Sequence, residues 1–268
     1  MKKVMFGLAC AAAVAAVADI ESSNVVGYST DTITKQTFNM VAVPFESTDG
    51  DGFKLDYCLS GANLTGSTDF ATADQVQIWD AATGTYDNWY YYVDEKDHSY
   101  DGWWDVITQM KMFEDSYPNG LPAGSSFWYK SADGAASNGT VQFSGQVPAA
   151  ADITTEILKG TFNMIASPYP TALKLNDTAA VDWSKATGTT DFATADQIQI
   201  WDATTGTYDN WFYYVDEKDH SYDGWWDVIT QMKMFEDSYP NGLAVGKPFW
   251  YKAIGSGTFD VKFISPIK

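Results

Sequence analysis

The sequence of 268 residues contains no arginine, and its 16 basic residues, all lysines, face 35 acidic ones. A formal net charge of −19 excludes the basic face with which proteins bind nucleic-acid phosphates through counterion release. Without arginine, the chain also lacks the guanidinium group that recognises phosphate or carboxylate through two parallel hydrogen bonds. We therefore expect no nucleic-acid partner, and most enzymes that act on nucleotides are disfavoured.

Histidine is almost as scarce, because only His98 and His220 occur, at equivalent places in two copies of one segment. None of the signatures G-x-S-x-G, H-E-x-x-H or a Cys-His pair is present. The sequence therefore predicts that the protein is not an enzyme. Its content of 45% hydrophobic and 16% aromatic residues nevertheless supplies material for a packed core and argues against disorder.

Long hydrophobic runs are missing except at the N-terminus. Two lysines at positions 2 and 3 precede an apolar run over residues 4–17, with small residues flanking Val17. This is the pattern of a secretory signal peptide cleaved after Ala18. No later segment approaches 18 consecutive apolar residues, so no membrane span is expected in the mature chain. We expect an exported protein that is extracellular or at the cell surface.

Cysteine is limited to Cys10 and Cys58. Leu8-Ala9-Cys10 permits a lipoprotein interpretation, which the continuation of the apolar run beyond Cys10 disfavours. Cleavage after Ala18 would leave Cys58 alone, without an internal disulfide. Cys58 is then either a small buried side chain, which we favour, or the site of a bridge between subunits.

The chain contains an internal sequence repeat with two copies. Residues 68–130 and 190–252 form the same 63-residue block, and the motif at residues 37–45 recurs at residues 161–169. We predict a signal peptide over 1–18, a first β-domain over 19–148 and a second over 149–268. The two blocks differ at seven positions: Val76/Ile198, Ala82/Thr204, Tyr90/Phe212, Pro122/Ala244, Ala123/Val245, Ser125/Lys247 and Ser126/Pro248.

Within a block, hydrophobic residues mostly recur with a period of two. Residues 75–79 alternate, residues 80–84 have the composition of a hairpin loop closed by glycine, and residues 85–93 return as an aromatic strand. Further strands are predicted over 127–130 and 141–144. Residues 105–113 have helical spacing and predict a short helix or an irregular crossover. The predicted fold is all-β, with two tandem antiparallel β-sandwich or barrel-like domains, each with at most a short helix.

Three motifs carry a resemblance to a family. They are Φ-Asn-Φ-Φ-x-x-Pro at residues 38–44, Ile-Trp-Asp-x-x-x-Gly-x-Tyr at 78–86 and Gly-x-x-Phe-Trp-Tyr at 124–129. The second copy repeats them at 162–168, 200–208 and 246–251. The arrangement resembles loosely characterised exported bacterial proteins built of tandem β-domains. That resemblance implies secreted or cell-surface β-modules without common catalytic residues.

Aromatic residues crowd both faces of the predicted strands. Each block holds 15 aromatic residues, and ten of the 11 tryptophans lie in the two blocks. Because successive strand residues face opposite sides, these strands are either covered on both faces or offer aromatic surface to a partner. The residues predicted to contact a partner or a sugar are Trp89, Tyr90, Tyr92, Trp104, Trp211, Tyr214 and Trp226.

Acidic residues gather in a loop that occurs once in each block. Asp97-His-Ser-Tyr-Asp-Gly-Trp-Trp-Asp, repeated from Asp219, places oxygen ligands at the spacing of a calcium loop but lacks the final glutamate. A solvated acidic loop is the alternative. The predicted ligands of one Ca²⁺ ion per unit are Asp97, Ser99, Asp101, Trp103 and Asp105, and then Asp219, Ser221, Asp223, Trp225 and Asp227.

The sequence favours a structural protein of the cell exterior. The subunits of surface layers, sheaths and filaments are typically exported and lack catalytic motifs. Tandem near-identical acidic β-units suit such a role, because identical units present identical patches for repeated contacts. Self-association or contact with cell-surface components is expected, with calcium as a stabiliser. The N-terminal strand over 23–34 is expected to pair within its own domain, or else with a neighbouring subunit. The alternative function is a carbohydrate-binding module or adhesin that binds polysaccharide through exposed Trp and Tyr.

Overall fold

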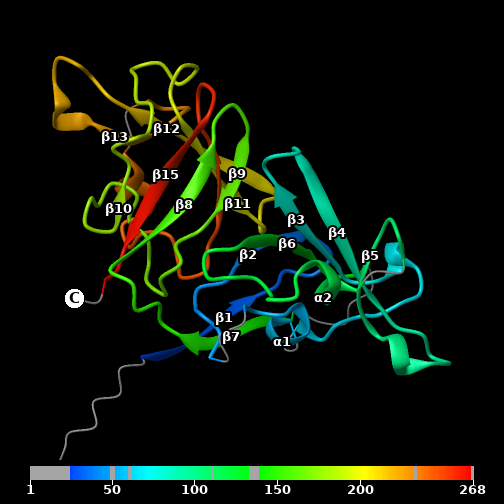
Figure 1. Cartoon of the computed structure of the whole chain (residues 1–268). Helices are drawn as coiled ribbons and strands as arrows, with labels where there is room; N and C mark the ends of the chain where they lie inside the picture. The colour runs from blue at the N-terminus through cyan, green and yellow to red at the C-terminus, as the bar shows by residue number, and fades with distance from the viewer. Residues whose placement is uncertain are drawn as a thin grey trace, which may run out of the picture.

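A computed structural model describes residues 25–48, 52–59, 62–109, 112–132, 139–231 and 234–266. These residues form fifteen strands in four antiparallel sheets, with helices of a single turn (Figure 1). The predicted fold class, all-β with two tandem antiparallel domains, is confirmed. None of the described helices has the length and hydrophobicity to cross a membrane. The predicted signal peptide, residues 1–18, lies outside the described residues.

The first domain is a sandwich of a five-stranded and a two-stranded sheet. Its elements are β1 Val26–Thr32, β2 Phe38–Ala42, α1 Leu55–Cys58, η2 Phe70–Thr72, β3 Gln75–Asp80, β4 Thr85–Tyr92, η3 His98–Tyr100, β5 Gly102–Asp105, α2 Phe113–Ser116, β6 Ser126–Lys130 and β7 Thr140–Gln146. The five-stranded sheet has the order β2-β6-β3-β4-β5. β1 pairs with β7, so the N-terminal strand lies within its own domain.

The second domain repeats this architecture. Its elements are β8 Asp152–Leu158, β9 Phe162–Ile165, β10 Val181–Asp182, β11 Gln197–Asp202, β12 Thr207–Tyr214, η4 His220–Tyr222, β13 Gly224–Asp227, α3 Phe235–Ser238, β14 Phe249–Lys252 and β15 Thr258–Ile264. Its five-stranded sheet, β13-β12-β11-β14-β9, has the same strand order as the first. The smaller sheet has the order β10-β15-β8, with β8 equivalent to β1.

The predicted hairpin loop between β3 and β4 is present. The Asp80 carboxylate accepts hydrogen bonds from the Ala82 N–H at 2.8 Å and the Thr83 hydroxyl at 2.9 Å. Gly84, with φ of 68°, closes the loop in a left-handed conformation that glycine adopts without strain. The same contacts recur in the second unit around Asp202.

Residues 106–109 form a turn and a bend after β5, so the irregular alternative holds there and not a helix. The Asp105 carboxylate accepts from the Thr108 N–H at 2.6 Å and so holds a turn directly after β5. Ile107 is 84% exposed, so it does not contribute to an apolar helix face. The single turn α2 begins only at Phe113, whose buried ring stacks on Tyr117 with centroids 4.7 Å apart.

Each domain has its own core between its two sheets. Trp89 and Trp103 are buried at the centre of the first core, and Trp211 and Trp225 take the same places in the second. Their indole N–H groups have no hydrogen-bond partner, a cost that the large apolar area of each ring offsets. The first core uses residues up to Val147, and the predicted boundary at 148/149 lies between β7 and β8.

In each domain, one buried carboxylate accepts hydrogen bonds from three donors. Asp74 accepts hydrogen bonds from the Tyr129 hydroxyl at 2.7 Å, the Ala132 N–H at 2.6 Å and the Thr65 N–H at 3.0 Å. Burial raises the pKa of Asp74, while these three donors favour its charged form. Asp196 makes the equivalent contacts in the second domain.

Cys58 lies in α1 and is fully buried in the first core. Its thiol points to the Leu55 carbonyl oxygen at 3.7 Å, and burial raises the thiol pKa. The structure therefore favours the buried side chain over the bridge between subunits.

Candidate functional site

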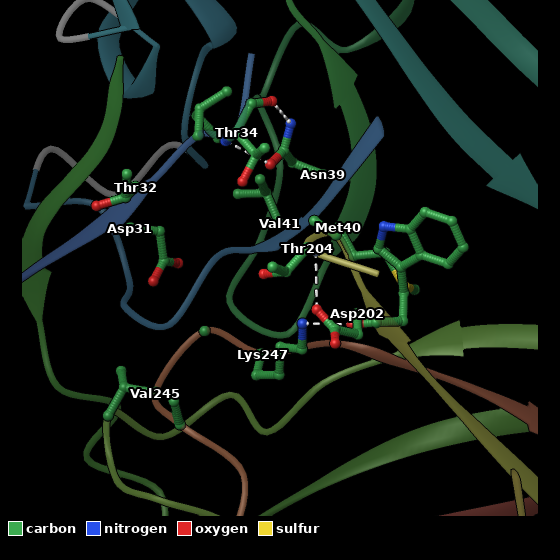
Figure 2. Close-up of a pocket in the computed structure, with 15 residues that line it drawn as sticks. Asp31, Thr32, Thr34, Asn39, Met40, Val41, Asp202, Thr204, Val245 and Lys247 are labelled. Atoms are coloured by element: carbon green, nitrogen blue, oxygen red, sulfur yellow. Dashed lines mark hydrogen bonds between the residues drawn. The ribbon is translucent and has the colours of Figure 1, made fainter. Parts of the chain in front are cut away.

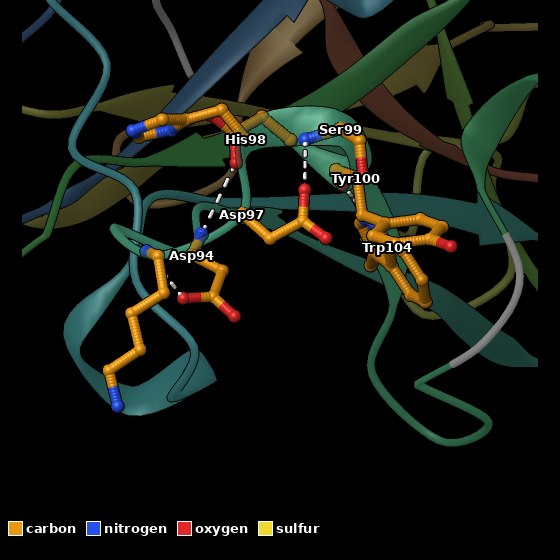
Figure 3. A network of polar contacts seen from close by, with 8 residues as sticks. Asp94, Asp97, His98, Ser99, Tyr100 and Trp104 are labelled. Carbon is orange, nitrogen blue, oxygen red and sulfur yellow. Dashed lines mark hydrogen bonds and ion pairs between the residues drawn. The ribbon is translucent and has the colours of Figure 1, made fainter.

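The predicted calcium loop follows β4 and contains the turn η3, which Asp97 and Asp101 flank, while Asp105 ends β5. The Asp97 carboxylate accepts from the Ser99 N–H at 3.1 Å and caps that turn (Figure 3). Asp101 accepts from the Asp94 N–H at 3.2 Å and lies 2.8 Å from the His98 ring nitrogen Nδ1. These contacts explain locally why the acids occur at this spacing.

The second copy of the loop has the same geometry. Asp219 accepts from the Ser221 N–H at 3.0 Å, Asp223 lies 2.8 Å from the ring of His220, and Asp227 accepts from the Thr230 N–H at 2.6 Å. The side chains of Trp103 and Trp225 are buried in the two cores. Over the described residues, no three His, Cys, Asp or Glu side chains form a group that could hold a metal. The calcium site stays a prediction.

The aromatic residues predicted to meet a partner fall into two classes. Trp89, Tyr90 and Trp211 are at most 2% exposed, so they cannot stack on a sugar in this structure. That part of the prediction is corrected: Trp89 and Tyr90 lie on opposite faces of β4, and both faces of the strand are covered at these positions. The others are partly exposed and form surface pairs, Tyr92 with Trp104 at 5.1 Å and Tyr214 with Trp226 at 4.8 Å between ring centroids.

Each surface pair lies beside its acidic loop. The Trp104 indole N–H donates to the Tyr100 carbonyl at 2.8 Å, which fixes the ring against the turn η3. Tyr100 itself is 57% exposed. Each unit thus presents a small aromatic patch next to carboxylates, a combination that suits the apolar faces and hydroxyl groups of a sugar.

A larger aromatic surface, which the sequence interpretation missed, joins the two domains. We call it the interdomain seam. It contains Met40, Trp79 and Trp128 of the first domain and Met164, Trp201 and Trp250 of the second, with Phe38, Tyr86, Phe162 and Tyr208 packed around them. These residues lie on the outer faces of the two five-stranded sheets, opposite the cores, and the two sheets meet there (Figure 1).

The seam has pseudo-twofold symmetry. The Trp79 indole N–H donates to the Phe162 carbonyl at 2.7 Å, and its counterpart Trp201 donates to the Phe38 carbonyl at 2.9 Å. The ring pair Trp79 and Trp250 is repeated by Trp201 and Trp128, at centroid distances of 5.5 and 5.6 Å and interplanar angles of 89° and 84°. Both units therefore use the same side chains for the same contacts.

A groove of about 220 Å³ opens on the seam. Trp79, Tyr86 and Phe162 line it together with Gln199, Tyr208 and Trp250. Burial raises the pKa of both tyrosines, so their hydroxyl groups remain neutral hydrogen-bonding groups at physiological pH. An aromatic groove with one amide and two hydroxyl groups is a binding surface for a ring that is apolar on its face and polar at its edge.

A second pocket, of about 240 Å³, marks where the symmetry breaks. Asp31 of the first domain and Lys247 of the second both face it (Figure 2). The Lys247 ammonium donates to the Trp201 carbonyl at 2.6 Å, and burial lowers the pKa of this lysine. Four of the seven residues by which the second block departs from the first line this pocket: Thr204, Ala244, Val245 and Lys247. The differences between the blocks thus cluster where the two units meet unequally.

Two of the seam tryptophans, Trp79 and Trp201, could have been found from the sequence. Trp79 falls on the same strand face as Gln75 and Gln77, opposite the core residue Val76. A tryptophan on the face that points away from the core indicates that another surface covers it.

Comparison with known proteins adds no relative. No family model matches the chain, and no curated protein or solved structure matches it. The resemblance to exported bacterial tandem β-domain proteins therefore stays a prediction that rests on the motifs alone.

Proposed function

We propose that this chain is an exported structural protein of the cell exterior, a surface-layer, sheath or filament subunit that works through self-association and carries no catalytic activity. The observation that supports it is the seam, where two near-identical units bind each other through one face. A unit that recognises a copy of itself is a module for assembly. The predicted signal peptide supports export.

The seam also limits how assembly proceeds. An interface in which both partners use the same surface closes after two copies, so the seam residues of each unit are fully used within one chain. Larger assemblies then need a second surface. Outside the seam, each unit still presents its acidic loop, its aromatic patch and one edge of its smaller sheet.

Electron microscopy tests the proposal directly. Images of the purified protein and of the cell surface should contain ordered arrays, sheaths or fibres that an antibody against this chain decorates. Dispersed particles of monomer size in both preparations would contradict it. The variant Trp79→Ala is a control, because it perturbs the contact between the two domains of one chain and not a contact between chains.

A second function is carbohydrate binding, and the aromatic groove of about 220 Å³ favours it. Ring stacking of Trp79 or Trp250 on a sugar would change tryptophan fluorescence, and so would stacking on Trp104 at the surface patch. Titration with a panel of polysaccharides distinguishes the groove from the surface patches, because the double variant Trp104→Ala with Trp226→Ala removes only the surface response. A spectrum that no polysaccharide changes would contradict this function.

A further inference from the structure

The outer edge of β1 is unpaired over the part of the chain that the structure describes, because β1 has β7 as its one neighbour. Two backbone hydrogen bonds define the ladder: the Val147 N–H donates to the Val25 carbonyl at 2.7 Å, and the Ile33 N–H to the Gly139 carbonyl at 2.9 Å. Hydrogen-bonded positions in an antiparallel ladder recur at every second residue. The positions in between direct their N–H and C=O groups away from β7. They are Val26, Tyr28, Thr30 and Thr32.

The same four residues turn their side chains to solvent. Val26 is 65% and Tyr28 is 63% exposed, and both threonines are exposed as well. The opposite face of β1 packs on the domain, where Gly27 lies so close to Phe45 that a Cβ would stand 2.2 Å from its ring. β1 is therefore anchored on one face and open along one edge.

The outward positions of β1 lack the usual protection of an edge strand. Natural proteins guard exposed edges with charges, proline or bulges, because an unguarded edge pairs with another chain. The four outward residues are uncharged, and the register of β1 with β7 is continuous from Val26 to Thr32. Asp31 is the charged residue of the strand, and its carboxyl faces inward to the pocket that Lys247 also lines.

β8 takes the same position in the second domain and is likewise the edge of its sheet. The Ser265 N–H donates to the Ala151 carbonyl, and the Lys159 N–H to the Gly257 carbonyl, both at 2.9 Å. By the same alternation, the outward positions between these two bonds are Asp152, Thr154, Glu156 and Leu158. The Asn163 side chain already pairs with the backbone of Leu158. At an offset of 124 residues, Asp152, Thr154 and Glu156 are the counterparts of Tyr28, Thr30 and Thr32.

The two edges differ in charge at matched positions. Asp152 and Glu156 stand where β1 has Tyr28 and Thr32, and Asp152 also lies 3.5 Å from the Lys262 ammonium. Two copies of this acidic chain repel each other over most of their surface. A contact between two β8 edges would set acids against acids, which is destabilising. The β1 edge lets two copies approach without opposed carboxylates.

We propose that β1 of one copy pairs antiparallel with β1 of a second copy, so that the strands β7-β1-β1-β7 form one four-stranded sheet across two chains. This inference rests on the proposed function, because it names the contact of the first assembly step. Each copy offers the same hydrogen-bonding edge, which is the requirement for a twofold contact. A two-stranded sheet also gains stability when it becomes four-stranded.

Matched substitutions test the contact in the full-length purified protein. Thr30→Lys places a charge at the centre of the β1 edge, and Thr154→Lys places the same charge at the equivalent position of β8. Sedimentation velocity over a range of concentrations should give a dissociation constant for Thr30→Lys that is at least about tenfold larger than that of the wild type. Thr154→Lys should leave it unchanged within about twofold. Circular dichroism and thermal melting establish that both variants fold alike.

Hydrogen exchange gives a readout that needs no substitution. In dilute wild-type protein, the outward amides of Tyr28 and Thr30 should exchange fast, and the paired amides of Gly27 and Ser29 slowly. At high concentration the outward amides should become protected while those of Thr154 and Glu156 stay fast.

The outcomes separate the two proposals. A chain that remains monomeric overturns both this contact and the assembly function. Two results would overturn the β1 contact and leave the assembly function standing. One is association that Thr30→Lys and Thr154→Lys weaken equally. The other is association without protection of the Tyr28 and Thr30 amides from exchange.

Discussion

The indole N–H of Trp79 in the first domain donates to the Phe162 carbonyl of the second at 2.7 Å, and Trp201 returns the contact to Phe38 at 2.9 Å. Trp79→Ala should lower the free energy of unfolding by about 3 kcal/mol, because it removes buried ring contacts and a hydrogen bond. Trp201→Ala should cost about the same, since the contacts are equivalent. Denaturant unfolding measures both.

The double variant Trp79→Ala with Trp201→Ala should unfold in two transitions, one for each domain, because the seam no longer couples them. Trp104→Ala, on the surface patch, is the control and should change the unfolding free energy by about 1 kcal/mol or less. A single transition in the double variant would contradict a seam that couples the two domains.

Asp74 should be much more sensitive than its exposed neighbour Asp69. Asp74→Ala leaves three donors without an acceptor in the core, which should cost about 3 kcal/mol or more. Asp69→Ala removes only the cap of a short exposed turn, worth about 1 kcal/mol. Thermal melting compares the two, and equal losses would argue against the buried network.

Cys58 should not react with thiol reagents in the native protein. Its side chain is fully buried, and burial raises its pKa, so the reactive thiolate is rare at neutral pH. Labelling with a chromogenic disulfide should proceed only on addition of denaturant. Rapid labelling of the native chain, or a dimer that reductant dissolves, would instead indicate an accessible cysteine.

The calcium prediction has a direct calorimetric test. If the loops bind calcium, millimolar calcium should release or absorb heat and raise the melting temperature, because a ligand that binds only the folded state stabilises it. The combined variant Asp101→Asn and Asp223→Asn should abolish both effects, while Asp69→Asn should leave them intact. No heat and no shift in the wild type would remove calcium from the account.

Salt should strengthen the association through β1. The contact consists of backbone hydrogen bonds between uncharged positions, while the net charge of −19 opposes the approach of two copies. Added salt screens that repulsion and does not weaken the strand pairing. Sedimentation at rising ionic strength should therefore give larger complexes, and smaller ones would indicate an interface of opposite charges.

Much of the fold followed from local chemistry. The alternation over residues 75–79 and the loop at Asp80 to Gly84 are set by neighbouring residues, and the structure contains both as expected. The sandwich architecture followed from the number of short strands and the turns between them. The conformation of residues 105–113 could not be predicted from the sequence. Helical spacing of apolar residues does not produce a helix unless the fold supplies a surface against which that helix can pack.

The candidate sites were less predictable because they depend on contacts far apart in the chain. Trp89 and Trp104 are both strand residues among other aromatic residues, yet one is in the core and the other lies on the outer face of β5. The pairing of Trp79 with Phe162 spans 83 positions and depends on two sheets meeting face to face. The difference between β1 and β8 was visible in their charges, but only the ladder identified which residues face outward.

The central claim is that this protein assembles with copies of itself, and mass measurement by light scattering tests it most directly. The purified protein, with and without calcium, should show an average mass that rises with concentration above that of one chain. A mass that stays at one chain, 29.5 kDa for the full sequence, up to the highest soluble concentration in both conditions would contradict the claim.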